Sequence, residues 1–269
     1  MNVVITGIGG RMGDALLRAV RSTSATRALA GTTRPGGPAQ RLTAELGLPV
    51  EESLDAALAR GADAVIDFTS PSATAEHVDA CVRAKLPIVI GTTGLDPETQ
   101  AAVARGAKEI PVVLAPNMSV GMNLLFRLVS QATEVLGEGY DVEIVEAHHR
   151  HKKDAPSGSA LRLAEAVARA RGEDLGDVAN FGREGQVGAR PRREIGIHAV
   201  RGGDVVGDHS VLFLADGERV ELAHRASSRE AFAGGAVRAA LWLAGHAPGL
   251  YTMQHVLGFE PIPGEETKP

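Results

Sequence analysis

Residues 2–13 read NVVITGIGGRMG, and this stretch decides the fold. Its first half is a short apolar run, which is typical of a buried β-strand. Glycines follow at every third position, Gly7, Gly10 and Gly13, and an amphipathic segment, Asp14–Arg21, comes directly after them. A glycine-rich turn between a strand and a helix lets backbone N–H groups converge on a dinucleotide pyrophosphate. The stretch therefore predicts a Rossmann-type nucleotide site, although a tight turn without a ligand has the same pattern.

Strands and helices alternate through the residues that follow. Apolar runs at residues 28–33, 62–68, 86–90 and 111–115 predict strands, and helices are expected at 71–84 and from Asp96 onward. Such alternation predicts a parallel sheet with right-handed crossovers, which binds ligands at the carboxyl ends of its strands. Four turns lie at that edge. They supply the candidate cofactor-binding residues Gly7, Ile8, Gly9, Gly10, Arg11, Met12, Thr33, Arg34, Gly91, Thr92, Thr93, Ala115, Pro116, Asn117 and Met118.

The tip of the second strand indicates which cofactor is bound. An NAD-binding protein places an acidic residue there to hold the ribose hydroxyls. This chain has Thr32, Thr33 and Arg34 at the tip and no carboxylate. An arginine without a neighbouring acid suits the 2′-phosphate of NADPH, so NADPH should be accepted. A solvated arginine in the loop that follows is the alternative.

The second half of the chain has a different pattern. A long helix is expected at 119–136, a long loop at 172–193, and strands at 195–201, 205–214 and 219–226. The turns RGGD (201–204) and ADGE (215–218) between these strands are typical of antiparallel hairpins. We therefore expect an open mixed sheet that packs a helix on one face and is covered by another subunit on the other. His198, His209 and His224 lie in these strands and are interpreted as packing or polar-face residues.

These patterns together define the expected architecture. The fold class is α/β, with a Rossmann-type parallel-sheet domain and an α+β substrate and oligomerisation domain. Residues 1–118 are expected to form the dinucleotide-binding domain, which a helix at 229–245 and a returning tail complete over residues 229–269. Residues 119–228 are expected to form the second domain.

Residues 146–160, EAHHRHKKDAPSGSA, carry a second chemical signal. Six consecutive side chains from His148 to Lys153 are cationic or can become so, in a chain of net charge −5. A strand pattern precedes the run, and Ser157-Gly158-Ser159 begins a helix after it. The run is therefore a strand-to-helix connection, and the helix N-terminus adds N–H groups suited to an anion. Histidines beside a lysine also supply proton donors near neutral pH, so we interpret this stretch as an active site.

Composition narrows the class of protein. Aromatic residues make up only 3% of the 269 residues, which disfavours single-stranded nucleic-acid binding by stacking. The single cysteine, Cys81, excludes an intramolecular disulfide and fits a reducing cytosol. No apolar run approaches the ~20 residues of a membrane span, and a functional glycine at position 7 leaves no room for a signal peptide. We expect a cytoplasmic protein without nucleic-acid or membrane partners.

The motifs as a set are similar to those of the dihydrodipicolinate reductase family. The matching stretches are GIGGRMG, DFTSP, GTTG, APNMSVGMN, EAHHRHKKDAPSGSA, IHAVRGGDVVGDH and GAVRAALWL, in order along nearly the whole chain. The resemblance implies a Rossmann domain, a tetramer-forming sheet domain, and use of NADPH or NADH. It implies reduction of 4-hydroxy-tetrahydrodipicolinate (dihydrodipicolinate) to tetrahydrodipicolinate in lysine and diaminopimelate biosynthesis. Ser159 stands where the family usually has threonine, and its hydroxyl is retained.

Carried onto this chain, the resemblance assigns roles within the cationic stretch. It makes His148 the general acid and Lys152 a second proton donor or electrostatic helper. It also implies that His149, Gly158 and Ser159 hold the carboxylates of a small dicarboxylate substrate. Hydride arrival on a conjugated C=C–C=N system builds negative charge, which a nearby imidazolium or ammonium group stabilises and then protonates.

Other readings of the same residues stay open. His151 shares a strand face with His149, so one of the two can be structural. A metal site of His148, His149 and His151 is disfavoured, because adjacent strand residues point to opposite faces and the flanking cations repel a metal ion; no metal is expected. A catalytically silent nucleotide-binding regulator of the same fold is the alternative function.

Overall fold

A computed structural model describes residues 1–259 of the chain. It divides into two compact units, which are described separately. Unit 1 contains residues 1–120 and 229–259, and unit 2 contains residues 121–228. Residues 260–269 of the expected 229–269 segment lie outside the described residues. No helix within residues 1–259 has the length and apolarity needed to cross a membrane.

Unit 1 is built on a seven-stranded sheet in the order β12-β6-β5-β4-β1-β2-β3, in which every strand pair is parallel. Its strands are β1 (Asn2–Ile5), β2 (Arg27–Thr32), β3 (Val50–Glu51), β4 (Ala64–Asp67), β5 (Ile88–Ile90), β6 (Pro111–Leu114) and β12 (Gly249–Tyr251). Its helices are α1 (Arg11–Ser22), α2 (Ala39–Leu46), α3 (Leu54–Leu58), α4 (Pro71–Ala84), α5 (Pro97–Gly106), α9 (Glu230–Leu243) and α10 (Met253–Leu257). Parallel connections place the carboxyl ends of these strands at one edge.

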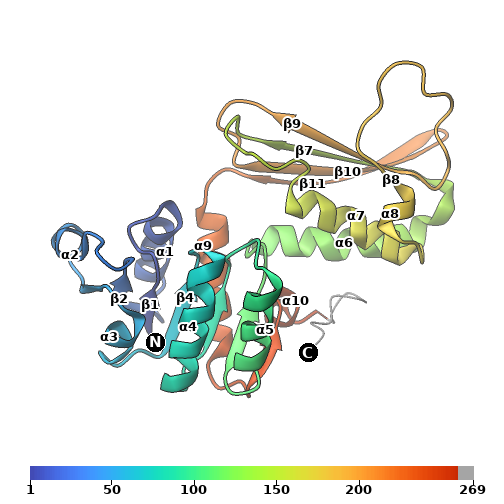
Figure 1. The fold of residues 1–269 in the computed structure, drawn as a ribbon. Coiled ribbons are helices and arrows are strands. Elements are labelled where there is room, and N and C mark those ends of the chain that lie inside the picture. Colours follow the sequence, from blue (N-terminus) through green and yellow to red (C-terminus); the bar gives the residue numbers. More distant parts are fainter. Residues whose placement is uncertain (260–269) are drawn as a thin grey trace. The chain divides into compact units, whose positions relative to one another are not determined.

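Helices cover both faces of this sheet (Figure 1). On one face, buried side chains of the sheet pack with those of α1, α9 and α10. On the other face, buried side chains of the sheet pack with those of α3, α4 and α5. Local sequence fixes the ends of the helices. Pro71 begins α4 in its first turn, and Asp96 caps α5 by accepting the Thr99 N–H at 2.7 Å. The result is the predicted parallel-sheet α/β unit, with helices on both faces of its sheet.

Unit 2 is a five-stranded mixed sheet in the order β11-β10-β7-β9-β8, and Figure 1 shows α6 and α7 on one of its faces. The strands are β7 (Asp141–His148), β8 (Ala179–Asn180), β9 (Ile195–Arg201), β10 (Gly207–Ala215) and β11 (Glu218–Ala226). The helical elements are α6 (Val120–Leu136), the 3-10 turn η1 (Gly137–Gly139), α7 (Gly158–Ala170) and α8 (Leu175–Val178). Alternate residues such as Ile144 and Phe213 pack with α6 and α7 in one buried core. The predicted open mixed sheet is confirmed.

The strand pairing within unit 2 differs from the prediction at one place. The β10–β11 hairpin forms through the 215–218 turn, as expected. The hairpin predicted between residues 195–201 and 205–214 is wrong, because β7 lies between β9 and β10. β9 pairs with β7 in parallel, and β10 pairs with β7 antiparallel. The turn at 201–204 therefore crosses over the end of β7. This crossing places the turn next to the cationic stretch, residues 148–153.

Smaller elements were not predicted. α2, β3 and α3 lie in the segment between the second strand and residue 62, and α8 and β8 lie inside the expected loop at 172–193. α1 begins at Arg11, three residues before the expected Asp14, because Gly10 already takes the extended N-cap conformation. The predicted bounds of the helix at 71–84 are confirmed.

Candidate active site

The glycine-rich turn in unit 1 has the close contacts that a nucleotide turn requires. Gly7 has a positive φ of 60°, which L side chains rarely adopt, and its carbonyl accepts the Gly10 N–H at 2.9 Å. A Cβ on Gly13 would lie 2.4 Å from the Ile8 carbonyl oxygen, so α1 packs directly against the turn. Gly10 is different, because its φ is −87° and its added Cβ would meet only the Gly7 oxygen at 3.2 Å. Its missing side chain therefore leaves open space beside the N-terminus of α1.

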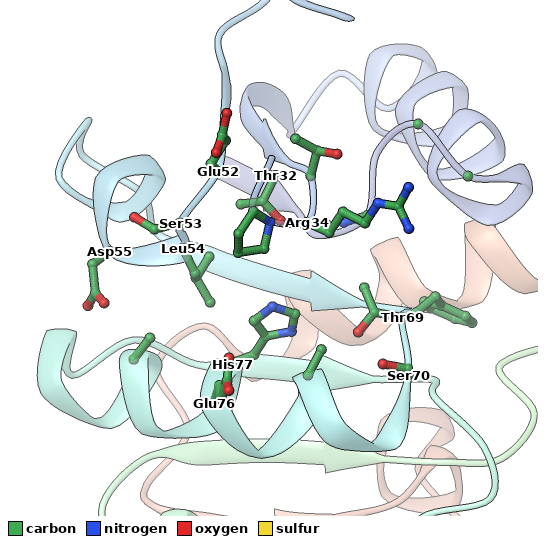
Figure 2. Close-up of a pocket in the computed structure, with 18 of the residues that line it drawn as sticks. Thr32, Arg34, Glu52, Ser53, Leu54, Asp55, Thr69, Ser70, Glu76 and His77 are labelled. Carbon is green, nitrogen blue, oxygen red and sulfur yellow. Dashed lines mark hydrogen bonds between the residues drawn. The ribbon is translucent and has the colours of Figure 1, made fainter. Parts of the chain in front are cut away.

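A pocket of about 820 Å³ opens beside this turn (Figure 2). Gly7, Gly9 and Gly10 line one part of it, and Thr33 and Arg34 reach it from the end of β2. Thr69 and Ser70, which follow β4, and His77 of α4 line another part. This volume lies in the range of small-molecule and cofactor sites. The structure thus brings five of the predicted cofactor residues into one pocket.

The other ten predicted cofactor residues lie outside the lining of this pocket. Ile8 is 1% exposed in the core, and its N–H donates to the Thr32 carbonyl at 3.0 Å. Thr92 is connected to the pocket indirectly, because its hydroxyl accepts the Thr69 N–H at 3.0 Å. Met118 is buried against α9, where a Cβ on Gly235 would overlap its carbonyl oxygen. The remaining residues are Arg11 and Met12 at the start of α1, and Gly91, Thr93, Ala115, Pro116 and Asn117 after β5 and β6.

Glu52 places a carboxylate near the end of β2, although no acidic residue follows β2 directly in the sequence. It follows β3, the edge strand beside β2, and lines the pocket together with Arg34 (Figure 2). Its Oε2 accepts the Gly36 N–H at 2.8 Å, so it also holds the loop after Arg34. A two-residue strand gives no detectable pattern, and for this reason sequence reasoning missed Glu52.

A buried carboxylate, Asp67, connects the strand ends at this edge. It accepts the hydroxyls of Thr6, Thr69 and Thr74 at 2.7, 2.6 and 2.7 Å, and Nδ1 of His77 lies 3.4 Å away. Burial alone would raise the pKa of Asp67, but the contacts with His77 and with these hydroxyls outweigh it and lower that pKa. An ionised Asp67 therefore holds the ends of β1 and β4 to the first turns of α4.

The cationic stretch of unit 2 is an ordered connection between β7 and α7. His149 N–H donates to the Val205 carbonyl at 2.7 Å, and Gly202 N–H donates to the His148 carbonyl at 3.0 Å. The 202–205 turn thus holds the end of β7. Ser157 caps α7, since its Oγ accepts the Ala160 N–H at 3.2 Å. The predicted strand-to-helix connection is confirmed.

His148 is oriented by a buried carboxylate. Its Nδ1 lies 2.7 Å from Oε2 of Glu146, whose side chain has no exposed surface. Arg201 approaches both oxygens of Glu146 at 2.7 and 2.8 Å, and the Ser157 N–H donates to Oε1 at 3.0 Å. Burial alone would raise the pKa of Glu146, but the bonds from Arg201, His148 and Ser157 outweigh it and lower that pKa. Glu146 is therefore an anion that accepts Nδ1–H, which leaves Nε2 of His148 as its second functional atom.

The environment of His148 also sets its charge. Burial lowers the pKa of His148 by more than the bond to Glu146 raises it. Its Nε2 lies over Gly207 of β10, where an added Cβ would be 3.1 Å away. Without a bound anion, the imidazole is therefore mainly neutral near pH 7.

Lys152 and the candidate substrate residues complete this part of the site. Nζ of Lys152 lies 2.7 and 2.9 Å from the two oxygens of Asp154, and this bond lowers the pKa of Asp154. Gly158 begins α7, is exposed, and has no atom within 4 Å of an added Cβ. Ser159 lies in the first turn of α7 and is half-buried. An unobstructed helix N-terminus beside a lysine can bind an anion.

The neighbouring histidines give no metal geometry. His149 and His151 have ring centroids 6.2 Å apart, and the His151 side chain is exposed. Within residues 1–259, no group of three or more His, Cys, Asp or Glu side chains is arranged to hold a metal ion.

Comparison with known proteins places the chain in a family. A family model described as the N-terminus of dihydrodipicolinate reductase matches residues 1–118, and one described as the C-terminus matches residues 121–257. The chain belongs to the dihydrodipicolinate reductase family. The 4-hydroxy-tetrahydrodipicolinate reductase of Myxococcus xanthus (strain DK1622) is 52% identical, over 97% of this chain and 98% of that protein. The enzyme of that name from Laribacter hongkongensis (strain HLHK9) is 53% identical, over 96% and 98%.

A solved structure of a family member agrees with the fold. Dihydrodipicolinate reductase from Paenisporosarcina sp. TG-14, with dipicolinate bound, has a TM-score of 0.75 and 26% identity, covering 94% of this chain and 97% of that one. The family and fold class predicted from the motifs are confirmed.

Three residues of this reductase-family site were not assigned to the site from the sequence. Glu146 and Arg201 form the buried ion pair around His148, and His209 packs against the His148 ring. Glu146 had a detectable signal, because residues two apart on a strand share a face. Arg201 and His209 had none, because their proximity depends on how β9 and β10 pair with β7.

Proposed function

We propose that this chain catalyses the NADPH- or NADH-dependent reduction of 4-hydroxy-tetrahydrodipicolinate to tetrahydrodipicolinate, a step of lysine and diaminopimelate biosynthesis. The observation that carries the proposal is the buried Glu146–His148 pair, which lies with Lys152 beside the N-terminus of α7. This arrangement joins an anion site to two proton donors. It occurs in a chain that is similar over its full length to reductases of this name.

The residues of unit 1 fit a nicotinamide dinucleotide. The pocket is large enough, and Gly10 leaves open the space that a Cβ would occupy beside the N-terminus of α1. We assign the pyrophosphate to the turn from Gly7 to Met12, and the adenosine ribose to Thr33 and Arg34. The remaining assigned residues follow β5 and β6 at the same strand edge; they are Gly91, Thr92, Thr93, Ala115, Pro116, Asn117 and Met118. When bound, the cofactor supplies the hydride.

The residues of unit 2 manage the substrate charge and the proton. His149, Gly158 and Ser159 are assigned to the two carboxylates, because the helix N-terminus and the nearby cations favour a dianion. The negative charge of the bound substrate favours protonation of His148, which opposes the effect of burial on its pKa. His148 and Lys152 then stabilise the charge that develops on the ring, and His148 donates its proton from Nε2.

The assembly and compartment are part of the same proposal. The sheet face of unit 2 that is opposite α6 and α7 carries Val145, Leu212 and Leu214, which are half-buried, and Val200, which is 51% exposed. Apolar side chains that remain accessible on a sheet face mark an interaction surface, and we assign this one to a homotetramer interface between the second units of neighbouring subunits. The lone cysteine, Cys81, is a free and buried thiol, which supports a reducing cytoplasmic location.

We further assign the dinucleotide role to residues 1–118 with 229–269, and the substrate and tetramer role to residues 119–228. The deciding experiment is a coupled assay that follows nicotinamide absorbance with enzymatically generated substrate. Oxidation of NADPH or NADH only when substrate is present is the expected result. Cofactor binding without oxidation would overturn the proposal in favour of a nucleotide-binding regulator. Binding of dipicolinate by titration calorimetry tests the dianion site separately from turnover.

A further inference from the structure

His209 is a buried histidine directly beside the proposed general acid. It lies on β10, is 4% exposed, and pairs in register with Glu146 of β7 on one side and His224 of β11 on the other. Residues paired in this way point to the same face of a sheet. His209 therefore shares the α7-covered face with Glu146 and His148.

Its Nε2 atom lies 3.0 Å from the hydroxyl oxygen of Ser157. Ser157 is the N-cap of α7, and its backbone N–H also donates to Glu146. One residue thus links three groups of the site: the helix N-terminus that faces the substrate carboxylates, the carboxylate that orients His148, and the His209 ring. A shift of Ser157 would disturb all three.

The His209 ring also contacts His148 directly. The two ring centroids are 5.2 Å apart and their planes are inclined at 78°, which is an edge-to-face arrangement. Gly207 makes this contact possible, because an added Cβ would lie 3.1 Å from Nε2 of His148 and 3.8 Å from Cε1 of His209. The His148 ring is therefore held by Glu146 at Nδ1 and by the His209 ring beside it.

Burial keeps the ring of His209 neutral. Burial lowers its pKa to about 4, and the nearby cationic groups act in the same direction. The groups that interact with it are His148 and Glu146 on β7, His224 on β11, and Lys152 in the loop before α7. Only Glu146 favours a charged ring, and Arg201 already pairs with both of its oxygens. A neutral His209 ring therefore adds no further cation when bound substrate has protonated His148 beside Lys152.

We propose that His209 is a positioning residue for the reaction assigned above, in which its uncharged ring fixes both the Ser157 hydroxyl and the His148 imidazole. It holds the N-terminus of α7 and Nε2 of His148 in place without touching the substrate itself. This inference rests on the proposed function for its catalytic meaning. Its structural content, the effect of His209 on His148, can be measured without turnover.

The kinetic test compares three variants. His209→Leu retains bulk but loses the bond to Ser157, and we expect kcat/KM to fall roughly 10–100-fold, the usual loss for a residue that orients a functional group. The apparent pKa of His148 in the pH dependence of kcat should shift as well. His209→Gln places an uncharged amide near the position of Nε2 and should restore most of the activity. His224→Leu, one strand farther from His148, is the matched control and should retain both the rate and the pH profile.

The second measurement reads His148 directly by ¹⁵N NMR of the histidine rings. In the wild-type protein we expect one tautomer with Nδ1 protonated, and in His209→Leu a mixture of tautomers. Ser157→Gly removes the hydroxyl at small cost to the helix cap, and it should also produce a mixture of His148 tautomers. This variant provides the test if His209→Leu does not fold. An unchanged His148 tautomer in these variants, or an unchanged pH profile with wild-type kcat/KM, would overturn the proposal.

The two proposals fail in different ways. A wild-type protein that binds NADPH but never oxidises it would disprove the reductase function, and the NMR result would still decide the role of His209. If the protein is an active reductase but the ¹⁵N signals of His148 are the same in His209→Leu and Ser157→Gly as in the wild type, only the positioning role is disproved.

Discussion

Nδ1 of His148 lies 2.7 Å from Oε2 of Glu146, and that carboxylate is completely buried. The pair holds one imidazole nitrogen so that the other is available for proton exchange. Because Arg201 also pairs with Glu146, the carboxylate orients His148 without making it permanently cationic. The same arrangement explains why burial dominates the pKa of His148 in the free protein.

The first prediction removes the charge of Glu146. Glu146→Gln retains the shape but leaves Arg201 without its anion and allows His148 to take the wrong tautomer. We expect kcat to fall by about 10²-fold or more, within the range of lost general-acid catalysis. Steady-state kinetics measures this effect, and Glu134→Gln, at an exposed position of α6, is the control. Equal kcat in the two variants would show that Glu146 has only a structural role.

The second prediction separates chemistry from binding within the cationic stretch. His148→Ala and Lys152→Ala remove groups that act mainly in the transition state, so kcat should fall roughly 10²–10⁴-fold with a smaller change in KM. Ser159→Ala removes a hydroxyl assigned to a carboxylate, so it should act mainly through KM. If both His148→Ala and Lys152→Ala keep kcat within a few-fold of wild type, the stretch is an anion receptor only.

Sequence patterns were sufficient for β1, β2, β4, β5 and β6 of unit 1, but not for β3 and β12. Each of the predicted strands is short and apolar and ends in a turn of distinctive composition, so the alternation with helices was visible without knowing any contact. The start of the helix at 71–84 was predicted to the residue because Pro71 marks it, and in the structure Lys85 ends the helix in a left-handed conformation. Local chemistry determined these elements, and local chemistry can be read from a sequence.

Pairing between distant strands was not available from the sequence. The RGGD turn at 201–204 has the composition of a hairpin, but β7 occupies the position between β9 and β10. The positions of Arg201 and His209 beside Glu146 follow from that insertion. A local turn signal contains no information about a strand more than fifty residues earlier, so these two side chains were found only in the structure.

The third prediction tests the nucleotide turn. Gly10→Val is the informative change, because Gly10 has an extended backbone conformation that valine adopts readily, whereas Gly7 has a positive φ. The added side chain would enter the space beside the Gly7 oxygen. We expect loss of NADPH binding by titration calorimetry, with an unchanged circular dichroism spectrum. Gly10→Ala should give an intermediate affinity. Normal cofactor binding by Gly10→Val would disprove the assignment of this turn.

The fourth prediction concerns the choice of cofactor. Arg34 and Glu52 line the same pocket, and no acidic residue follows β2 directly. Arg34→Ala should therefore weaken NADPH more than NADH, because only NADPH carries the 2′-phosphate. Arg41→Ala, which also lines the pocket, is the control for a general loss of positive charge. Equal losses for the two cofactors in Arg34→Ala would show that this guanidinium does not contact the 2′-position.

The fifth prediction is a loss of stability of unit 2 in acid, which follows from two groups with shifted pKa values. Burial lowers the pKa of His209 to about 4, so between pH 6.5 and 4 the unfolded chain binds a proton that the folded chain does not. Stability therefore falls as the pH falls through this window, by about 3 kcal/mol in total. His209→Gln should remove this part of the pH dependence.

Glu143 extends the same effect to lower pH. Burial alone would raise its pKa, but hydrogen bonds from Arg183, Arg190 and His198 outweigh it and hold the pKa at about 2. Its ion pairs therefore stabilise the fold above about pH 4.5 and are lost as the pH falls toward 2. The only tryptophan, Trp242, lies in unit 1, so its fluorescence does not report unit 2. Hydrogen exchange of α7 and β10 is the suitable measurement. Protection in β10 that stays constant from pH 6.5 to 4 in the wild-type protein, or that falls equally in His209→Gln, would contradict the assignment of the upper window to a neutral His209.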